Sequence, residues 1–538
     1  MGLLYFPKTK KAQSRSKFRA GRFRHCILVA SVLIAGFLFF QPETLSGQVP
    51  LPEKTITIPR QNTTLYKALN LISNQAECLF IYESKTVESD KRVRLIADQE
   101  PLHKVLGNLL VNTGLTYRIL GKHILIYRAK GEDPPPDAME PALPADTLKN
   151  VVISGRICDN QSKAAIPFAT IGIAEEHLGT VTNNDGFFTL KIPASLIGTS
   201  LVVSHLGYTS QYIPVRLISE QQVDLYLDRR VISIQEVIIR YIDPNLIMEK
   251  ALEQRRMNYA DEPVYLTAFY REGVQRNNSY TSYSEAVFRV YKSPVDEGDR
   301  ADQVKLLKSR KVQDSNCPDT VFLKLKAGVQ SALLLDIVKC IPGFLDQMPP
   351  AEYTYKYSNL VSYNARDAYA IGFTKKAGEN NALYCGTLYI AKEGFAILGA
   401  DFEINPTCLD KAAEELVLKK SSGLIVKLKK ISYSVSYMPF NGRYYLSHVR
   451  CDLEVATRLR HHLSSDHFKT FLELATCKID TADVVKFPKQ ETMKPGVVFS
   501  DQPYRNNDAF WGDFNIIPPE ASLREALGKI IGKIEEVE

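Results

Sequence analysis

Short apolar runs alternate with turn residues between Val151 and Arg240. The runs recur at intervals of roughly ten residues, a spacing typical of a small all-β sandwich. Two turn signals divide them, Asn184-Asp185-Gly186 and Gly207-Tyr208, and turns of this composition accept positive φ. The alternation predicts a core that contains Phe188, Leu190, Ile192, Val202 and Tyr208.

The segment from Thr55 to Arg128 combines helical and strand periodicities. Leucine and isoleucine at helical spacing predict a helix over Thr64 to Ala76, and a second helix that Pro101 opens and Gly114 ends. Alternating or wholly apolar runs predict strands at TITIP, CLFIY, RVRLIA, LTYRI and HILIYR. The predicted order is a duplicated strand–helix–strand unit.

The half of the chain after Tyr241 is predicted to be mainly strands. Apolar and polar residues alternate at Ile431 to Tyr437 and Val449 to Val455, and Phe440-Asn441-Gly442-Arg443 is a hairpin turn. Strands with one apolar face and one polar, solvent-facing side predict an antiparallel sheet. We expect it to be twisted, with helices against its concave side.

Two helices flank these strands. One is predicted over Pro244 to Asn258, with Leu246, Ile247, Ala251 and Leu252 facing inward. The other ends the chain, with a capping box at Ser522 and Glu525 and an apolar face behind it.

The formal charge of +7 is concentrated at the N-terminus. Met1 to Arg24 contains eight Lys and Arg residues and no acidic residue, so the remainder is near neutral and gives no indication of nucleic-acid binding. The apolar run from Ile27 to Phe40 is shorter than the about 20 residues of a spanning helix and suits a secretory signal. Residues 1–47 are therefore predicted to be a signal peptide cleaved near Ser46 or Gly47, with an uncleaved anchor as the alternative.

A proline-rich segment separates two of the predicted folded units. Gly131 to Pro144 carries five prolines among acidic residues, a composition that favours a semi-rigid spacer. The predicted fold class is multidomain α+β, with boundaries at 1–47 (signal peptide), 53–130 (βαβ-repeat module), 131–149 (linker), 150–240 (sandwich) and 241–538 (antiparallel sheet domain with a terminal helix).

The N-terminal module resembles a known family. TITIPRQNTTLYKALNLIS, VRLIADQEPLHKVLGNLLVNTGLTYRI and HILIYR are similar to the short N-terminal (STN) module of secretins and TonB-dependent transducers. In that family the module binds other proteins in the periplasm and catalyses nothing. The resemblance therefore implies that residues 55–128 dock a protein partner.

The sandwich resembles the carboxypeptidase regulatory-like domain, a prealbumin-like fold of about seven strands. Asn183 stands where that family usually has Asp. The chain contains no HxxE zinc motif, so the resemblance implies no carboxypeptidase activity. The residues that carry the resemblance are Gly155, Pro167, Ala169, Thr170, Asp185, Gly186, Phe188, Gly207 and Tyr208.

Together these two modules usually precede the plug and barrel of a TonB-dependent transporter. Only 298 residues follow Arg240, whereas about 22 strands of about 10 residues each use roughly 220 before any loop or plug. The plug and barrel are therefore predicted to be missing, and a smaller outer-membrane barrel receptor stays open as an alternative.

The C-terminal half resembles an uncharacterised envelope family through AFYRE at Ala268, GTLYI at Gly386 and FWGDFNII at Phe510. Its strand pattern also resembles lipoprotein-carrier half-barrels. These resemblances imply a location in the cell envelope and no particular chemistry.

Candidate chemistry is sparse. No GxSxG, HExxH, P-loop or GxGxxG motif occurs. His461, His462, Asp466 and His467 have metal-ligand residue types, but a solvated loop is the preferred interpretation because no further ligand cluster is evident. No catalytic, cofactor-binding or metal-binding residue is predicted.

Three other features have structural interpretations. Arg271 and Glu272 are read as an ion pair at a strand end, and Trp511 as a packing anchor, with an exposed sugar platform as the alternative. The nine cysteines include no CxxC. An oxidising compartment permits disulfides among them, whereas Cys451, on the apolar phase of a strand, is expected to be a buried thiol.

These expectations favour a non-enzymatic binding or scaffold protein that is exported to the periplasm, with outer-membrane association as a further option. Residues 55–128 would dock a periplasmic or outer-membrane partner of TonB-linked transport or signalling. The C-terminal domain would offer a membrane-surface or glycan contact, and no nucleic-acid partner or cofactor is expected. The alternative is an enzyme acting on envelope carbohydrate or peptide polymers through Glu403, Asp452 and Glu454, which lie on wet strand faces.

Overall fold

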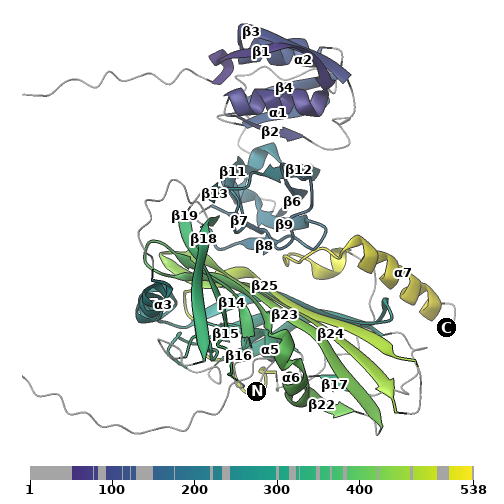
Figure 1. The fold of residues 1–538 in the computed structure, drawn as a ribbon. Coiled ribbons are helices and arrows are strands. Elements are labelled where there is room, and N and C mark those ends of the chain that lie inside the picture. The colour runs from purple at the N-terminus through teal and green to yellow at the C-terminus, as the bar shows by residue number, and fades with distance from the viewer. Residues whose placement is uncertain are drawn as a thin grey trace, which may run out of the picture.

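The computed structural model describes residues 51–535, apart from 77, 83–91, 112, 121–122, 129–149, 175, 219–221, 233–242, 298–301, 314–322, 326–327, 347–351, 364–365, 380–383, 421–422, 461–463 and 494–507. Figure 1 shows three parts stacked in chain order, with the N-terminal module at the top, the sandwich in the middle and a large sheet below. The chain is mostly β, and the large antiparallel sheet expected from the alternation is confirmed. The predicted signal peptide and linker lie outside the described residues.

The N-terminal module packs two helices against short strands. β1 pairs with β3 in one sheet, and β4-β5-β2 form part of another. The apolar faces of both helices are buried in one core with Ile56 and Ile124, as their 3.6-residue spacing requires. The elements are β1 (Thr55–Thr64), α1 (Leu65–Ala76), β2 (Leu79–Tyr82), β3 (Arg92–Pro101), α2 (Leu102–Leu110), β4 (Leu115–Leu120) and β5 (His123–Arg128).

Seven strands form the sandwich. One sheet has the order β11-β10-β7-β8, and the other, β12-β6-β9, continues into β4-β5-β2 of the N-terminal module. The junction is the antiparallel pair Asp224 and Tyr82. The strands are β6 (Asn150–Asp159), β7 (Thr170–Ile173), β8 (Gly179–Val181), β9 (Phe187–Pro193), β10 (Ser200–Ser204), β11 (Gln211–Pro214) and β12 (Gln222–Leu227).

The predicted sandwich core is confirmed at Phe188, Leu190 and Ile192, but Tyr208 is only half-buried and Val202 is out of phase. Phe188, Leu190 and Ile192 are fully buried. Val202 is only half-buried and Val203 is buried instead, because Val203 faces the buried Ile171 on β7. A continuous apolar run such as LVVS does not reveal which of its two faces points inward.

The C-terminal half forms an 11-stranded sheet in the order β13-β18-β19-β20-β21-β23-β24-β25-β14-β15-β16. Every neighbouring pair in it is antiparallel. The strands are β13 (Val231–Ile232), β14 (Val264–Arg276), β15 (Ser279–Lys292), β16 (Gln303–Gln313), β18 (Tyr353–Tyr363), β19 (Arg366–Lys375), β20 (Tyr384–Ala391), β21 (Ile397–Ile404), β23 (Leu424–Phe440), β24 (Arg443–Leu459) and β25 (Asp466–Asp480). β17 (Leu323–Leu325) and β22 (Val417–Lys420) pair separately.

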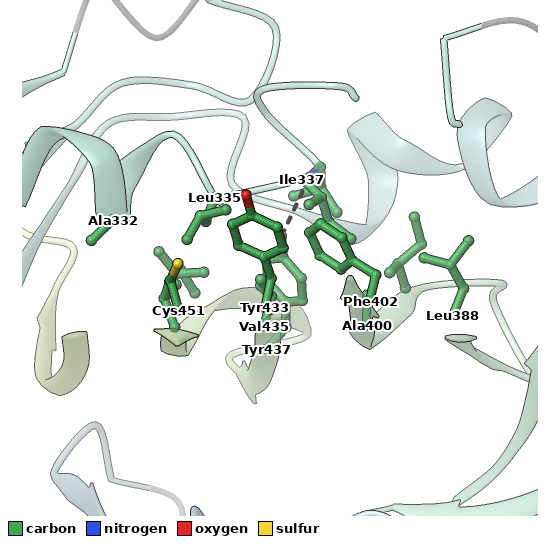
Figure 2. Packing of buried hydrophobic residues seen from close by; sticks show 14 of the residues in the cluster. Ala332, Leu335, Ile337, Leu388, Ala400, Phe402, Tyr433, Val435, Tyr437 and Cys451 are labelled. Carbon is green, nitrogen blue, oxygen red and sulfur yellow. Dashed lines mark hydrogen bonds between the residues drawn. The ribbon is translucent and has the colours of Figure 1, made fainter. Parts of the chain in front are cut away.

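One face of this sheet is covered by helices and a buried loop. Residues of α3, α5, α6 and the segment that follows α5 share one apolar core with the sheet. Figure 2 shows Leu335 and Ile337 lying against Phe402, Tyr433 and Val435. These helices cover one face, whereas α7 packs on the other face through Leu523 and Leu527, so the expectation that the helices share one side holds only in part. The helices of this half are α3 (Pro244–Glu253), α4 (Arg255–Asn258), α5 (Val329–Leu333), α6 (Leu409–Leu416) and α7 (Ala521–Glu535).

The predicted helix over Pro244 to Asn258 is interrupted. It breaks at Gln254, whose ψ is 0°, into α3 and α4. Ile247 and Ala251 are buried as predicted, whereas Leu246 is 49% exposed. No helix within the described ranges has both the length and the apolar character needed to cross a membrane.

The opposite face of the sheet is covered by the sandwich and by the segment before α7. Trp511 is fully buried there, edge-on to Phe269 of β14 with ring centroids 5.6 Å apart. Val181 of β8 and Ile517 belong to the same smaller apolar cluster. Trp511 is therefore a packing anchor, and the exposed sugar platform is excluded for it.

Candidate functional site

A row of facing residues crosses seven neighbouring strands on the sandwich side of the large sheet. Facing residues on antiparallel strands have Cβ atoms about 5 Å apart and share one face, so neighbouring side chains of opposite charge can pair directly. We call these residues the charged row: Asp401, Ser434, Arg450, Glu473, Arg271, Glu285 and Arg310.

Glu473 lies at the centre of the charged row and is fully buried. Its carboxylate accepts hydrogen bonds from Arg271 Nε and, at 3.3 Å, from Arg450 Nη1, and it pairs with His448 Nε2 at 2.8 Å. Burial alone would raise the pKa of Glu473, but Arg271, Arg450 and His448 hold that pKa well below its ordinary value. A buried carboxylate needs such compensation, since desolvation strongly disfavours its charge.

The second half of the charged row is equally buried. Arg310 Nε donates to Glu285 Oε2 at 2.6 Å, and the Tyr283 hydroxyl donates to Glu285 Oε1 at 2.6 Å. The Arg310 guanidinium lies 5.0 Å from the Trp511 ring centroid, within cation–π distance. Each buried charge here is thus paired with an opposite charge or an aromatic face.

The charged row also joins the sandwich to the C-terminal segment. Arg271 Nη2 donates to Glu520 Oε1 at 2.9 Å, and Asn184 Nδ2 of the sandwich donates to the same oxygen at 2.9 Å. Asn183, fully buried in the same turn, donates to the Pro518 carbonyl at 3.0 Å. Three segments distant in sequence therefore meet at Arg271.

The β8–β9 turn also caps the N-terminus of helix α7. Asp185 Oδ2 accepts a 2.8 Å hydrogen bond from the Ala521 backbone N–H, so the helix N-terminus is capped by a residue of the sandwich. The predicted capping box is wrong in position, because α7 begins at Ala521 and Ser522 lies inside it. A local motif could not reveal a cap that arrives from 336 residues away.

A pocket of about 390 Å³ opens at one end of the charged row, between the sandwich and the sheet. We call it the interdomain pocket. Its volume is in the range of small-molecule sites, and it lies at a domain boundary, where such sites are common. Its sheet side presents small serine side chains on β23 between acidic side chains on β21 and β24; the polar lining residues include Asp401, Glu403, Ser432, Ser434, Arg450 and Asp452.

Phe168 of the sandwich lines the pocket in a left-handed conformation, with φ of 59°. Such a conformation costs a non-glycine residue about 1–3 kcal/mol. The ring stacks on His448 with centroids 4.8 Å apart, and Arg450 lies 5.4 Å from its centroid. The aromatic ring therefore lies directly over the charged row.

The acidic residues of the pocket differ in their hydrogen-bond and ion-pair partners. Arg450 makes a bidentate contact with Asp452 at 2.8 and 3.0 Å, and Ser434 Oγ donates to Asp401 at 2.7 Å. Glu403 forms no ion pair with a described residue and is half-buried. Glu403 and Asp452 both face Ser432, so two strand spacings, about 10 Å, separate their backbones. The pocket can hydrogen-bond hydroxyl or ammonium groups of a ligand.

A second concave surface lies on the N-terminal module between β3 and α2. This β3–α2 groove has a volume of about 220 Å³. Ile96, at 55% exposure, and the apolar Val105 and Leu109 line it together with Arg94, Asp98 and Glu100. Within the described part of the chain β3 pairs only with β1, so its other edge is open.

A buried ion cluster lies on the opposite face of the large sheet. Lys292 Nζ contacts Asp302 and Asp336 at 2.8 Å each, and Lys339 Nζ contacts Asp302 at 2.5 Å. The Tyr437 hydroxyl donates to Asp336 at 2.9 Å. The adjoining cavity holds only about 30 Å³, roughly the volume of one water, so these side chains connect the buried loop to the sheet and offer no ligand space.

Several residues singled out from the sequence have different roles. Arg271 and Glu272 are successive residues within β14, so their side chains point to opposite faces of the sheet. Arg271 pairs with Glu473, whereas Glu272 accepts a hydrogen bond from the Tyr270 hydroxyl on the helix-covered side. The predicted ion pair between them is wrong. Burial raises the pKa of Glu272.

The histidine-rich stretch does not converge on a metal site within the described part. Asp466 pairs with Arg276 at 2.7 Å, and His467 faces Ala456 across the strand pair. His461 and His462 lie outside the described residues. No group of three or more potential metal ligands occurs among the residues that the structure places.

Every described cysteine is a free thiol. Cys451 is buried as expected, and burial raises its pKa well above the ordinary value. Burial also raises the pKa of Cys477 to about 12. Cys26 and Cys317 lie outside the described residues.

Comparison with known proteins identifies one domain. Residues 153–239 match the family described as CarboxypepD_reg-like domain, so the sandwich is a carboxypeptidase regulatory-like domain. The match does not extend to residues 53–130. A search of curated proteins finds no match.

Three solved structures have weak similarity to the chain. A DUF1329 family protein from Desulfovibrio piger has 13% identity and a TM-score of 0.21, over 46% of this chain and 96% of that one. Lipovitellin has 6% identity and a TM-score of 0.20, over 43% and 27%. The ferripyoverdine receptor of the outer membrane of Pseudomonas aeruginosa has 12% identity and a TM-score of 0.13, over 78% and 56%. TM-scores this low do not establish a shared fold or function.

Proposed function

We propose that this protein is a non-enzymatic binding or scaffold protein of the cell envelope, whose N-terminal module docks a protein partner of TonB-linked transport or signalling. The observation that carries the proposal is the β3–α2 groove. An open strand edge beside a groove with apolar and charged lining can accept an extended segment of another protein, with main-chain hydrogen bonds for affinity and side-chain pockets for specificity.

The order of elements in this module supports its assignment to the STN type. Two strand–helix–strand units follow one another, as in β1-α1-β2 and β3-α2-β4, before β5 closes the module. The basic N-terminal segment and the apolar run from Ile27 to Phe40 support export. An exported docking module on a β-rich support is the arrangement that these features favour.

The test is capture of the partner from an envelope extract by the full chain with and without a changed groove. Ile96→Lys introduces a charge on the exposed apolar side chain of the groove, and Val111→Lys makes the same change at a 73% exposed position that does not line it. A partner captured by the wild type and the Val111 variant, and lost with the Ile96 variant, supports the proposal. Equal capture by all three proteins, or a partner independent of residues 55–128, overturns it.

The interdomain pocket favours a second candidate, an enzyme acting on envelope carbohydrate or peptide polymers. It brings Glu403 and Asp452, but not Glu454, to one cavity. The bidentate contact with Arg450 already engages both carboxylate oxygens of Asp452, which argues for binding rather than hydrolysis. Release of soluble fragments from envelope polymers, abolished by Glu403→Gln and unaffected by Glu454→Gln, would establish the enzyme instead.

A further inference from the structure

One end of the large sheet carries a concentration of cations. It is the end of β23 to β25 that lies away from the Asn441-Gly442 turn. The exposed cations there, which we call the cationic patch, are Lys427, Lys429, Lys430, Arg458, Arg460 and Lys469.

The strand register places most of these side chains on one face. Lys430 faces Glu454, which in turn faces Lys469, and Ile425 faces Arg458. The register shift between Leu428 and Lys430 adds Lys429 to the strand as an extra residue. Glu454 is the single carboxylate in direct cross-strand opposition to the patch.

The cationic patch differs from the other cations of this sheet face. Arg271, Arg310 and Arg450 are buried and paired with carboxylates. None of the six patch cations forms an ion pair with a residue that the structure describes. The chain from Val417 to Lys430 contains five lysines and no acidic residue, whereas an ordinary solvated face interleaves both signs of charge.

An apolar side chain lies among these charges. Ile425 is 43% exposed at the start of β23, opposite Arg458. Exposed cations around an exposed aliphatic group are the combination that binds anionic lipid surfaces, where the cations approach headgroup phosphates and the apolar group enters the interface.

The position of the patch also suits a flat partner. Figure 1 shows the ends of β23 and β24 at the lower right, on the opposite side of the molecule from the N-terminal module. Three neighbouring strands contribute its cations, so it is about 10 Å wide. A broad patch fits a surface better than it fits a single linear polyanion.

We propose that the cationic patch binds the surface of an anionic membrane through lipid phosphates. This contact is independent of the docking proposed for the N-terminal module. It leaves the β3–α2 groove facing away from the lipid.

The test is sedimentation of the full chain with vesicles of phosphatidylcholine alone or mixed with phosphatidylglycerol. The protein is expected to sediment with the mixed vesicles only, and less as salt is raised. Neutralising Lys427, Lys429, Lys430 and Arg458 to Gln is expected to weaken this binding at least about tenfold. The matched control neutralises four exposed cations of the N-terminal module, Arg60, Lys67, Arg92 and Arg118, and is expected to bind as the wild type does.

Three outcomes would overturn the proposal. Equal loss of vesicle binding in the patch and control variants would show that only the net charge of the protein determines binding. Undiminished vesicle binding by the patch variant would place the contact elsewhere. Circular dichroism checks that this variant is folded, and a second variant with only Lys427 and Arg458 changed repeats the test. The third outcome is that the protein binds soluble polyphosphate as tightly as the mixed vesicles, with Ile425→Ser weakening neither interaction. That result would identify a polyanion site instead of a membrane site.

Discussion

At the scale of single residues, Glu473 determines whether the sandwich side of the sheet can be buried. Arg271, Arg450 and His448 all contact its carboxylate, and none of these three side chains is more than 8% exposed. A buried ion pair contributes little net stability over a well-packed apolar group, but removal of one partner leaves uncompensated charge. The charged row therefore makes the structure sensitive to individual changes.

Replacement of Glu473 by Gln is expected to lower the free energy of unfolding by about 3–5 kcal/mol, because two guanidinium groups lose their buried counter-charge. Chemical denaturation measures the difference. The control is Glu491→Gln, which breaks the partly exposed pair with Lys305 and should cost less than about 1 kcal/mol. Similar costs for both variants would show that the charged row is not tightly coupled.

The same carboxylate predicts an acid dependence of stability. The pKa of Glu473 is depressed in the folded protein, so its stabilising contribution is complete above its unfolded pKa of about 4.3 and is lost as pH falls toward the folded value. The difference in unfolding free energy between wild type and Glu473→Gln should thus shrink below about pH 4.3. Denaturation curves collected along a pH series test this, and a difference that stays constant through that range would contradict it.

At the scale of elements, the sequence predicts strands and helices better than it predicts their partners. Leu65, Leu69 and Ile72 of α1 are buried because helical spacing already places them on one face. Arg271 and Glu473 are separated by 202 residues, and each one alone looks like a polar residue on a wet strand face. The buried centre of the charged row arises only when β14, β24 and β25 become neighbours, and the interdomain pocket only when β21, β23 and β24 do, so no local pattern could reveal them.

The β8–β9 turn is the element that connects the sandwich with α7. Asp185→Ala should remove the cap of α7 and cost about 1 kcal/mol, with faster amide hydrogen exchange in the first turn of the helix. Asn184→Ala, which removes a neighbouring contact to Glu520 but leaves the cap, is the comparison variant. Unchanged exchange at Ala521 in the Asp185 variant would exclude this cap from the stability of α7.

At the scale of the whole molecule, the sandwich, the large sheet and the C-terminal segment share one buried polar seam. The N-terminal module meets the sandwich differently, through the facing pair Asp224 and Tyr82 between β12 and β2 and through Leu125, which packs in the apolar core of the sandwich. Figure 1 shows β3 and α2, whose residues line the groove, at one end of the molecule, and the ends of β23 and β24 that carry the cationic patch at the other. A support with two separated contact surfaces is the arrangement expected of a scaffold.

The most direct test of the docking function is site-specific photo-crosslinking in intact cells. A photoreactive amino acid replaces Ile96 inside the β3–α2 groove or, as the control, Val111 on the same module outside it. One discrete protein adduct is expected from position 96 and none from position 111. No adduct at position 96, or the same adducts from both positions, would contradict the proposal that this groove docks a protein partner.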